Sequence, residues 1–366
     1  SHINSFDVGV GKTMTAIITL IQGILSGQFK RPLLVVPNST YMKWISEMIG
    51  DSKTGQNGIL TGTGVTINEW YNLGTDVLRS IDLKKEVPEN SITLVTFEGA
   101  RRIGFGKRVQ DTMLTELVNI LSQTKDQDMR MRDKEINYQK FLEMIGVGLK
   151  DTVVDLELMK FDGLFVDEAH KWNHVFEGVK ADEGGKKRYG LTAATSEVAQ
   201  KGFFLAMYMQ RTYRANVHFY TATPFTSSPI EIFSMLSMVA YNSLQSAGIL
   251  NIETFFNLFV REKSEQVVDY AERITIKDVI RGYENRIVLQ RHIHNHILFR
   301  TGQEVGIRRP CKIVIPLVSV VENNVARRLK SDESILSYLT MTAVQRKQQQ
   351  NIVARMQIAT EKGART

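Results

Sequence analysis

The sequence predicts an α/β fold, a three-layer sandwich around a mainly parallel sheet, with a helical insertion and a mainly helical C-terminal region. Short apolar runs bounded by turn residues indicate strands that are buried on both faces of such a sheet. These runs are residues 33–36, 92–95, 164–166 and 217–220. Segments with helical spacing lie between them, and alternating strands and helices are typical of βαβ units.

Helices are predicted in order along the chain. The first, residues 13–25, follows a glycine loop, the second, 40–49, follows a Pro-Asn-Ser cap signal, and the third covers 196–214. Residues 110–160 interrupt the alternation, and their apolar positions at helical spacing predict an inserted helical hairpin. We expect residues 254–295 to be mostly helical, 312–318 to form a strand, and 325–366 to be helical or frayed. The predicted domains are residues 1–240, with the insertion at about 108–160, and a mainly helical region over 241–366.

Composition narrows the class of protein. The chain has 366 residues, 43% hydrophobic and 23% charged, which excludes a disordered or collagen-like protein. The single cysteine, Cys311, excludes an internal disulfide framework and a cysteine-based zinc site. No apolar run reaches the roughly 18 residues that a membrane span needs, and the chain opens on polar residues, so we expect a cytoplasmic protein. The net charge of +7 permits a polyanionic partner without requiring one.

The first motif that carries chemistry is Gly9-Val10-Gly11-Lys12-Thr13, directly before an apolar helix. It lacks the first glycine of the full Walker A pattern, because Phe6 holds that place. Glycines let backbone N–H groups close around phosphates, and the helix N-terminus adds its dipole. Lys12 would reach the β- and γ-phosphates and Thr13 would ligate Mg²⁺. The alternative is a glycine-rich turn before an ordinary helix.

The second and third motifs also lie at predicted strand ends. Asp167 and Glu168 end the run 164–168, where a buried carboxylate pair is costly unless a cation sits beside it. Asp167 would hold Mg²⁺ through water and Glu168 would polarise the attacking water. Thr221-Ala222-Thr223-Pro224 follows another strand, and its hydroxyls could sense the γ-phosphate. Read alone, the second motif has the alternative of a strand-end acidic pair with a nearby cap, and the third is better explained by a strand-end turn.

G-x-G-K-T, D-E-A-H and T-A-T-P, in this order and each at a strand end, resemble the first RecA-like lobe of superfamily 2 helicases and translocases. Residues 32–37 with Trp44 look like motif Ia of the Snf2-like branch, residues 95–98 resemble its next nucleic-acid-contacting strand end, and residues 223–236 resemble its "GTP…ELFSLL" run. The chain is similar also to large helicases of phages and mobile elements, often fused to DNA methyltransferases. The resemblance covers about residues 6–240.

This resemblance implies a RecA-like P-loop ATPase lobe that uses ATP and Mg²⁺ and works with a second RecA-like lobe on nucleic acid, DNA rather than RNA. It implies that Lys12, Asp167 and Glu168 serve catalysis, and that Gly9 to Thr13 bind the nucleotide. His170, Thr221 and Thr223 would couple the nucleotide site to movement of the strand.

One departure concerns the arginine finger that the second lobe of the family supplies, because no Q-x-x-G-R-x-x-R-type motif is present. We therefore expect part of a larger translocase, which on its own binds Mg·ATP weakly and hydrolyses it slowly or not at all. Two other functions fit the P-loop. One is a nucleotide-binding interaction or assembly module without turnover. The other is an unrelated P-loop kinase, which has no reason to carry T-A-T-P.

Two basic segments are candidate phosphate contacts, and the alternative for each is a solvated loop. They comprise Lys186, Lys187 and Arg188 after the D-E-A-H motif, and Arg101 and Arg102 after residues 95–98. His292, His294 and His296 alternate, which makes a metal conceivable on a strand, although a structural role is favoured. Trp44 and Trp172 are interpreted as packing residues.

Overall fold

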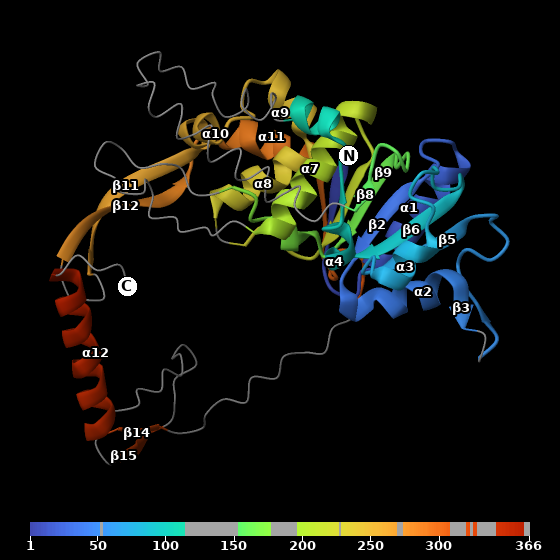
Figure 1. Cartoon of the computed structure of the whole chain (residues 1–366). Coiled ribbons are helices and arrows are strands. Elements are labelled where there is room, and N and C mark those ends of the chain that lie inside the picture. The colour runs from blue at the N-terminus through green and yellow to red at the C-terminus, as the bar shows by residue number, and fades with distance from the viewer. Residues whose placement is uncertain are drawn as a thin grey trace. The chain divides into compact units, whose positions relative to one another are not determined.

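The core of the molecule is a parallel sheet (Figure 1). The computed structural model describes residues 1–51, 54–113, 153–176, 196–226, 228–268, 274–307, 320–322, 325–327 and 342–361. Within these ranges the sheet has seven strands in the order β13-β1-β10-β9-β2-β6-β5, and all neighbours pair in parallel. Their bounds are β1 His2–Phe6, β2 Pro32–Val36, β5 Thr66–Tyr71, β6 Ser91–Thr96, β9 Gly163–Asp167, β10 Val217–Thr221 and β13 Ile297–Arg300.

Both faces of the sheet are covered, and strand β2 shows how. Leu33 and Val35 join one buried cluster, whereas Leu34 and Val36 join a second one. Successive side chains of a strand point to opposite faces, so each cluster is one filled layer between the sheet and its helices. The predicted three-layer α/β sandwich is confirmed, and β2, β6, β9 and β10 are the strands expected from the apolar runs.

Helices α1 (Lys12–Leu25) and α2 (Tyr41–Ile49) pack on one face, and α4 (Phe97–Ala100), α7 (Glu197–Tyr213) and α8 (Pro229–Val239) on the other. In α1 the residues directed at the sheet are Ala16, Ile17, Leu20 and Ile24, which follow helical spacing. Helix α8 begins with Pro229 behind Ser228, whose hydroxyl accepts a hydrogen bond from the Ile230 amide at 3.3 Å. Local capping and apolar periodicity therefore agree with the sandwich.

The segment expected to be mostly helical, residues 254–295, also contains strands, so this prediction was wrong in part. Helices α10 (Ile252–Phe259) and α11 (Arg286–His296) flank β11 (Val260–Val268) and β12 (Ile274–Tyr283), which form a two-stranded sheet. β-branched residues, which favour strands over helices, are frequent in β12, with Ile274, Thr275, Ile276, Val279 and Ile280. The predicted hairpin falls largely on residues 114–152 and the strand 312–318 on residues 308–319, both outside the described residues.

The remaining elements complete the described chain. They are the helices α3 (Thr75–Ser80), α9 (Tyr241–Ser246) and α12 (Ala343–Glu361), and the short 3-10 helices η1 (Asn38–Thr40) and η2 (Ala169–Trp172). The described chain also has three short strand pairs, β3 (Gly50–Asp51) with β4 (Gln56–Asn57), β7 (Ile103–Gly104) with β8 (Val154–Asp155), and β14 (Val320–Glu322) with β15 (Val325–Arg327). The chain divides into one compact unit of residues 1–263 and 280–307 and another of 264–279 and 308–366. The first unit contains the whole parallel sheet, including β13. The domain boundary at residue 240 stays a prediction.

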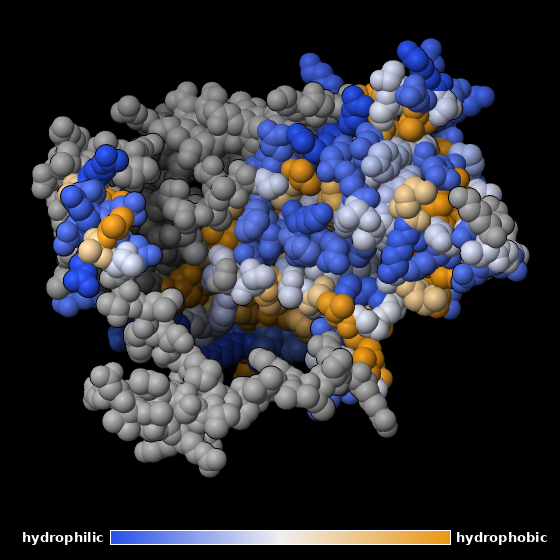
Figure 2. Space-filling view, turned by 90° about the horizontal axis from the view of Figure 1, so that it is seen from below, coloured by the Kyte–Doolittle hydropathy of each residue, from blue (hydrophilic) through white to orange (hydrophobic). Residues whose placement is uncertain are grey.

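Among the described residues, every helix is too short or too polar to cross a lipid bilayer. Figure 2 shows one face of the molecule, on which hydrophobic residues occur in small groups among hydrophilic ones.

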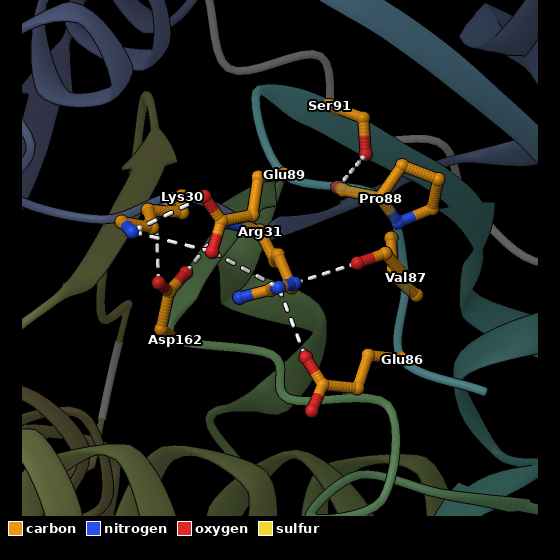
Figure 3. A network of polar contacts seen from close by, with 8 residues as sticks. All are labelled: Lys30, Arg31, Glu86, Val87, Pro88, Glu89, Ser91 and Asp162. Carbon is orange, nitrogen blue, oxygen red and sulfur yellow. Dashed lines mark hydrogen bonds and ion pairs between the residues drawn. The ribbon is translucent and has the colours of Figure 1, made fainter.

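A polar network fixes the amino ends of three neighbouring strands (Figure 3). Asp162, just before β9, accepts hydrogen bonds from the backbone amides of Lys30 (2.7 Å) and Arg31 (2.8 Å), just before β2. The Arg31 guanidinium forms ion pairs with Glu86 (3.0 Å) and Glu89 (3.2 Å), which precede β6. The network holds β9, β2 and β6 in register at one edge of the sheet and leaves their carboxyl ends at the other edge.

Candidate functional site

The glycine loop connects strand β1 to helix α1 at the carboxyl edge of the sheet. Gly9 and Gly11 have φ values of 84° and 93°, a left-handed conformation that favours glycine. A Cβ added at either position would meet no atom within 4 Å, so the backbone conformation and not a lack of space requires glycine. The loop ends at Gly11, the N-cap of α1, where no side chain caps the helix. The first backbone amide groups of α1 are therefore available to an anion.

Lys12 is the first residue of α1, and its ammonium group turns back over the loop. Its Nζ donates a hydrogen bond of 3.1 Å to the carbonyl oxygen of Phe6, the last residue of β1. The ammonium group of Lys12 thus connects the end of the glycine loop to its beginning. This arrangement places a positive charge beside the backbone amides, which is the chemistry that binds a phosphate.

Asp167 is the last residue of β9 and lies at the carboxyl edge of the sheet, as the glycine loop does. Asp167 is buried, and its Oδ2 accepts a hydrogen bond of 3.1 Å from the indole Nε1 of Trp44, while its Oδ1 accepts one of 3.0 Å from the Glu168 amide. Burial raises the pKa of the Asp167 carboxyl above its ordinary value. The hydrogen bond from Trp44 and the charge of Lys12 act in the opposite direction. Asp167 is therefore a desolvated carboxylate that one nearby cation already favours in its charged form.

Glu168 and His170 link β9 to β10. Glu168 adopts a left-handed conformation with φ 51° directly after the strand, and its Oε2 lies 3.2 Å from Nδ1 of His170. The same His170 nitrogen lies 3.1 Å from Oγ1 of Thr221, the buried last residue of β10. The hydroxyl of Thr221 also accepts a hydrogen bond of 3.3 Å from the Thr223 amide. The second and third motifs are thus in direct contact, although 51 residues separate His170 from Thr221.

One cavity of about 790 Å³ joins the first two motifs. Six of the predicted site residues line it, namely Gly9, Gly11, Lys12, Thr13, Asp167 and Glu168. Its lining residues do not include Val10, His170, Thr221 or Thr223. A further wall was not anticipated from the sequence; it comprises Thr40, Lys43, Trp44, Ser46 and Glu47 at and beyond the start of α2, and Gln56, Asn57 and Ile59. The sequence signal for that wall is weak, because α2 follows the apolar run of β2 without any glycine or acidic motif of its own.

The basic residues after β6 make internal contacts. A guanidinium nitrogen of Arg101 lies 2.7 Å from Glu197 Oε2, and Arg102 donates to the carbonyl oxygen of Leu73. Their role in binding nucleic acid stays a prediction. Lys186, Lys187 and Arg188 lie outside the described residues.

A metal site built from His292, His294 and His296 is not favoured by the structure. The three residues lie in helix α11 and not on a strand, so they do not share one face. His296 Nδ1 lies 3.4 Å from the Ser1 carbonyl oxygen and His294 packs edge-on against Phe299. Within the described ranges, no group of three or more histidine, cysteine or acidic residues could hold a metal ion.

Fold and site together define a class. A parallel sheet covered by helices on both faces, with a glycine loop after β1 and carboxylates after β9, is a RecA-like three-layer α/β sandwich compatible with a P-loop. The chain is similar to Defense against restriction protein B of Escherichia phage P1, with 21% identity over 355 residues. The alignment covers 83% of this chain and 15% of the phage protein, so the chain spans a small part of that protein's length. No protein-family model matches the chain.

Proposed function

We propose that the chain is the first ATPase lobe of an ATP-dependent DNA helicase or translocase, which couples hydrolysis of Mg·ATP to movement on nucleic acid. The observation that supports this most is the cavity in which the glycine loop, Lys12 and the two carboxylates after β9 meet. The order of the three motifs along the chain supports the helicase class over other P-loop proteins. The net charge of +7 is compatible with a nucleic-acid partner.

The triphosphate would bind across the glycine loop. The unpaired amides at the start of α1 would donate to phosphate oxygens, and the helix dipole favours the negative charge. Lys12 would exchange its hydrogen bond with the Phe6 carbonyl for the β- and γ-phosphates. That exchange replaces a neutral carbonyl acceptor with a charged phosphate oxygen, so the ammonium group gains the attraction of an opposite charge.

The donors for Mg²⁺ would be the hydroxyl of Thr13 and, through water, the carboxylate of Asp167. Both residues line the same cavity, and both offer the oxygen ligands that Mg²⁺ prefers. A buried carboxylate such as Asp167 is costly without a cation beside it, so the residues fit the ion. Bound there, Mg²⁺ would neutralise charge that grows on the phosphates during transfer.

Glu168 would orient the water that attacks the γ-phosphate. Its side chain is about one third exposed and lines the cavity, and its bond to His170 limits where the carboxylate can turn. A base must lie within hydrogen-bond reach of the proton that it accepts, and the first position after Asp167 meets that need if the γ-phosphate lies over Lys12. His170 would then transmit the position of Glu168 to Thr221 and the loop behind β10.

The test measures ATP turnover and ATP binding by the native chain and by Glu168→Gln, with and without duplex DNA. We expect slow turnover that Glu168→Gln abolishes, while Mg·ATP still binds, because the substitution removes the basic oxygen and keeps the shape of the side chain. Tight binding with turnover that is zero in both chains under all conditions would favour the nucleotide-binding interaction module. Turnover that persists in Glu168→Gln would contradict the assigned role of Glu168.

A further inference from the structure

Trp44 connects helix α2 to the carboxylate at the end of β9. Its side chain is almost fully buried, and its indole Nε1 donates a hydrogen bond of 3.1 Å to Oδ2 of Asp167. The two residues are 123 positions apart, so the contact depends on the tertiary fold. Trp44 also lines the cavity that contains Lys12 and Thr13.

Among the described residues, two hydrogen bonds fix the orientation of the Asp167 carboxylate, and the indole of Trp44 donates one of them. The other comes from the backbone amide of Glu168, which donates to Oδ1 at 3.0 Å. Each oxygen thus receives one donor, from a different element of the fold. A carboxylate oxygen has two lone-pair sites, so each oxygen keeps one for another partner. The geometry restrains rotation about the last bond of the side chain without using up the acceptor capacity.

The helix that carries Trp44 is itself anchored to the sheet. The buried hydroxyl of Tyr41, in the first turn of α2, donates to the carbonyl oxygen of Leu94 at 3.4 Å and accepts from the Tyr71 amide at 3.1 Å. The start of α2 is therefore held against β6 and β5. Because α2 is anchored in this way, the indole group of Trp44 is held in place and can restrain the Asp167 side chain at the end of β9.

The contact is not a general property of buried tryptophans in this chain. Trp172 is also buried, and its Nε1 has no hydrogen-bond partner among the described residues. A buried indole N–H is therefore tolerated here without a partner. The pairing of Trp44 with Asp167 is a specific feature of the cavity wall.

We propose that Trp44 is a positioning residue for the magnesium site, which holds the Asp167 carboxylate with its remaining lone pairs directed at the hydration shell of the ion. This inference rests on the proposed function. Groups that orient a metal's ligands contribute strongly to metal affinity, and their loss commonly costs 10- to 100-fold. Because Asp167 would contact the ion through water, we expect an effect near the lower limit, about 10-fold.

Calorimetric titration of ATP into the chain, once in the presence of Mg²⁺ and once in EDTA, separates this positioning role from simple packing. In Trp44→Phe the ring remains and the N–H is lost. The gain in ATP affinity on adding Mg²⁺ should fall about 10-fold, while the affinity in EDTA stays within about twofold of the native chain. Trp70→Phe is the matched control, because Trp70 is buried on β5 and is not among the cavity's lining residues. It should keep the full magnesium-dependent gain.

A second pair of variants guards against misfolding of Trp44→Phe. Trp44→benzothienylalanine exchanges the N–H for sulfur at nearly unchanged ring shape, and it should reproduce the reduced gain. In an Asp167→Asn chain the further change Trp44→Phe should have no additional effect on the gain, because the two residues act together. An unchanged magnesium-dependent gain in both Trp44 variants overturns this inference alone. A native chain that binds no ATP overturns the proposed function, and this inference with it.

Discussion

Nδ1 of His170 lies 3.1 Å from Oγ1 of Thr221, and this one contact joins the ends of two adjacent strands, β9 and β10. The same ring nitrogen lies 3.2 Å from Glu168, the residue proposed to orient the attacking water. The Thr221 hydroxyl accepts a hydrogen bond from the Thr223 amide, at the start of the loop that leads to α8. A change at Glu168 can therefore reach that loop through two side chains.

The role of this contact in coupling can be tested with Thr221→Val, which removes the hydroxyl and keeps the shape. Coupling between two sites is reciprocal and typically amounts to 1–3 kcal/mol, or about 5- to 150-fold in affinity. We expect DNA affinity to respond to a nonhydrolysable ATP analogue in the native chain and in Thr221→Ser. The response should be lost in Thr221→Val, while ATP affinity stays the same. An equal response in all three chains, measured by fluorescence anisotropy, would remove Thr221 from the coupling path.

Stability at the opposite edge of the sheet should depend on Asp162. Asp162→Ala leaves the backbone amides of Lys30 and Arg31 without their acceptor, which should lower the free energy of unfolding by about 1–3 kcal/mol. Glu86→Ala removes only an ion pair whose carboxylate is half exposed, and should cost less than about 1 kcal/mol. Urea denaturation measures both, and equal losses would show that the two backbone hydrogen bonds are not what stabilises this edge.

Much of the fold could be predicted because four of the strands are short apolar runs that lie inside the sheet. Strands β1 and β13 were not predicted, and the reason lies in their residues. β1 contains His2, Asn4 and Ser5 and so lacks a continuous apolar pattern, whereas β13 has three apolar residues that come just after the segment 254–295, which was interpreted as mostly helical. Their position in the sheet depends on parallel pairing between segments almost 300 residues apart. Local sequence patterns do not contain that information.

The glycine loop and the acidic strand end could be predicted in the same way, because each motif is local. The wall provided by α2 could not, since the hydrogen bond between Trp44 and Asp167 spans 123 residues. The interpretation of Trp44 as a packing residue was incomplete. Its ring is buried as expected, but its N–H also donates a hydrogen bond to Asp167.

Stability should fall in mild acid because of His218. This residue is buried on β10, where its ring centroid lies 4.4 Å from that of Phe165 and 4.6 Å from that of His2. Within the part of the chain that the structure describes, neither of its ring nitrogens has a hydrogen-bond partner. Burial lowers its pKa well below the ordinary value of 6.5, so the folded chain keeps it neutral. The unfolded chain binds a proton below about pH 6.5, and the folded chain does not. Stability is therefore fully present above that pH and is lost as the pH falls below it, by up to about 1.4 kcal/mol per pH unit.

In His218→Phe this part of the pH dependence should disappear between pH 7 and pH 5. The acid response of His2, whose pKa burial lowers to about 4, would remain. The exposed His174 provides a matched control, since His174→Gln should keep the native profile. Denaturant midpoints of the three chains across this range check the prediction. Identical slopes for the native chain and His218→Phe would show that His218 is not the group responsible.

If the chain binds nucleic acid, as proposed, phosphate contacts should dominate the binding, because a translocase must move over any sequence. The logarithm of the affinity for DNA should then fall steeply with the logarithm of salt concentration, as the release of counterions requires. Replacing Lys186, Lys187 and Arg188 together by alanine should make this slope shallower. A slope that does not change would indicate that this segment makes no phosphate contact.

The central claim, that the glycine loop and Lys12 bind the phosphates of ATP, is tested most directly by calorimetric titration of Mg·ATP into the native chain and Lys12→Ala. Each lost charge-assisted hydrogen bond costs about 1–3 kcal/mol, so the affinity of Lys12→Ala should fall at least several-fold. Lys30→Ala is the control, because Lys30 pairs with Glu89 at the other edge of the sheet and should leave binding unchanged. Equal affinities of the native chain and Lys12→Ala, or no binding by either, would contradict the account.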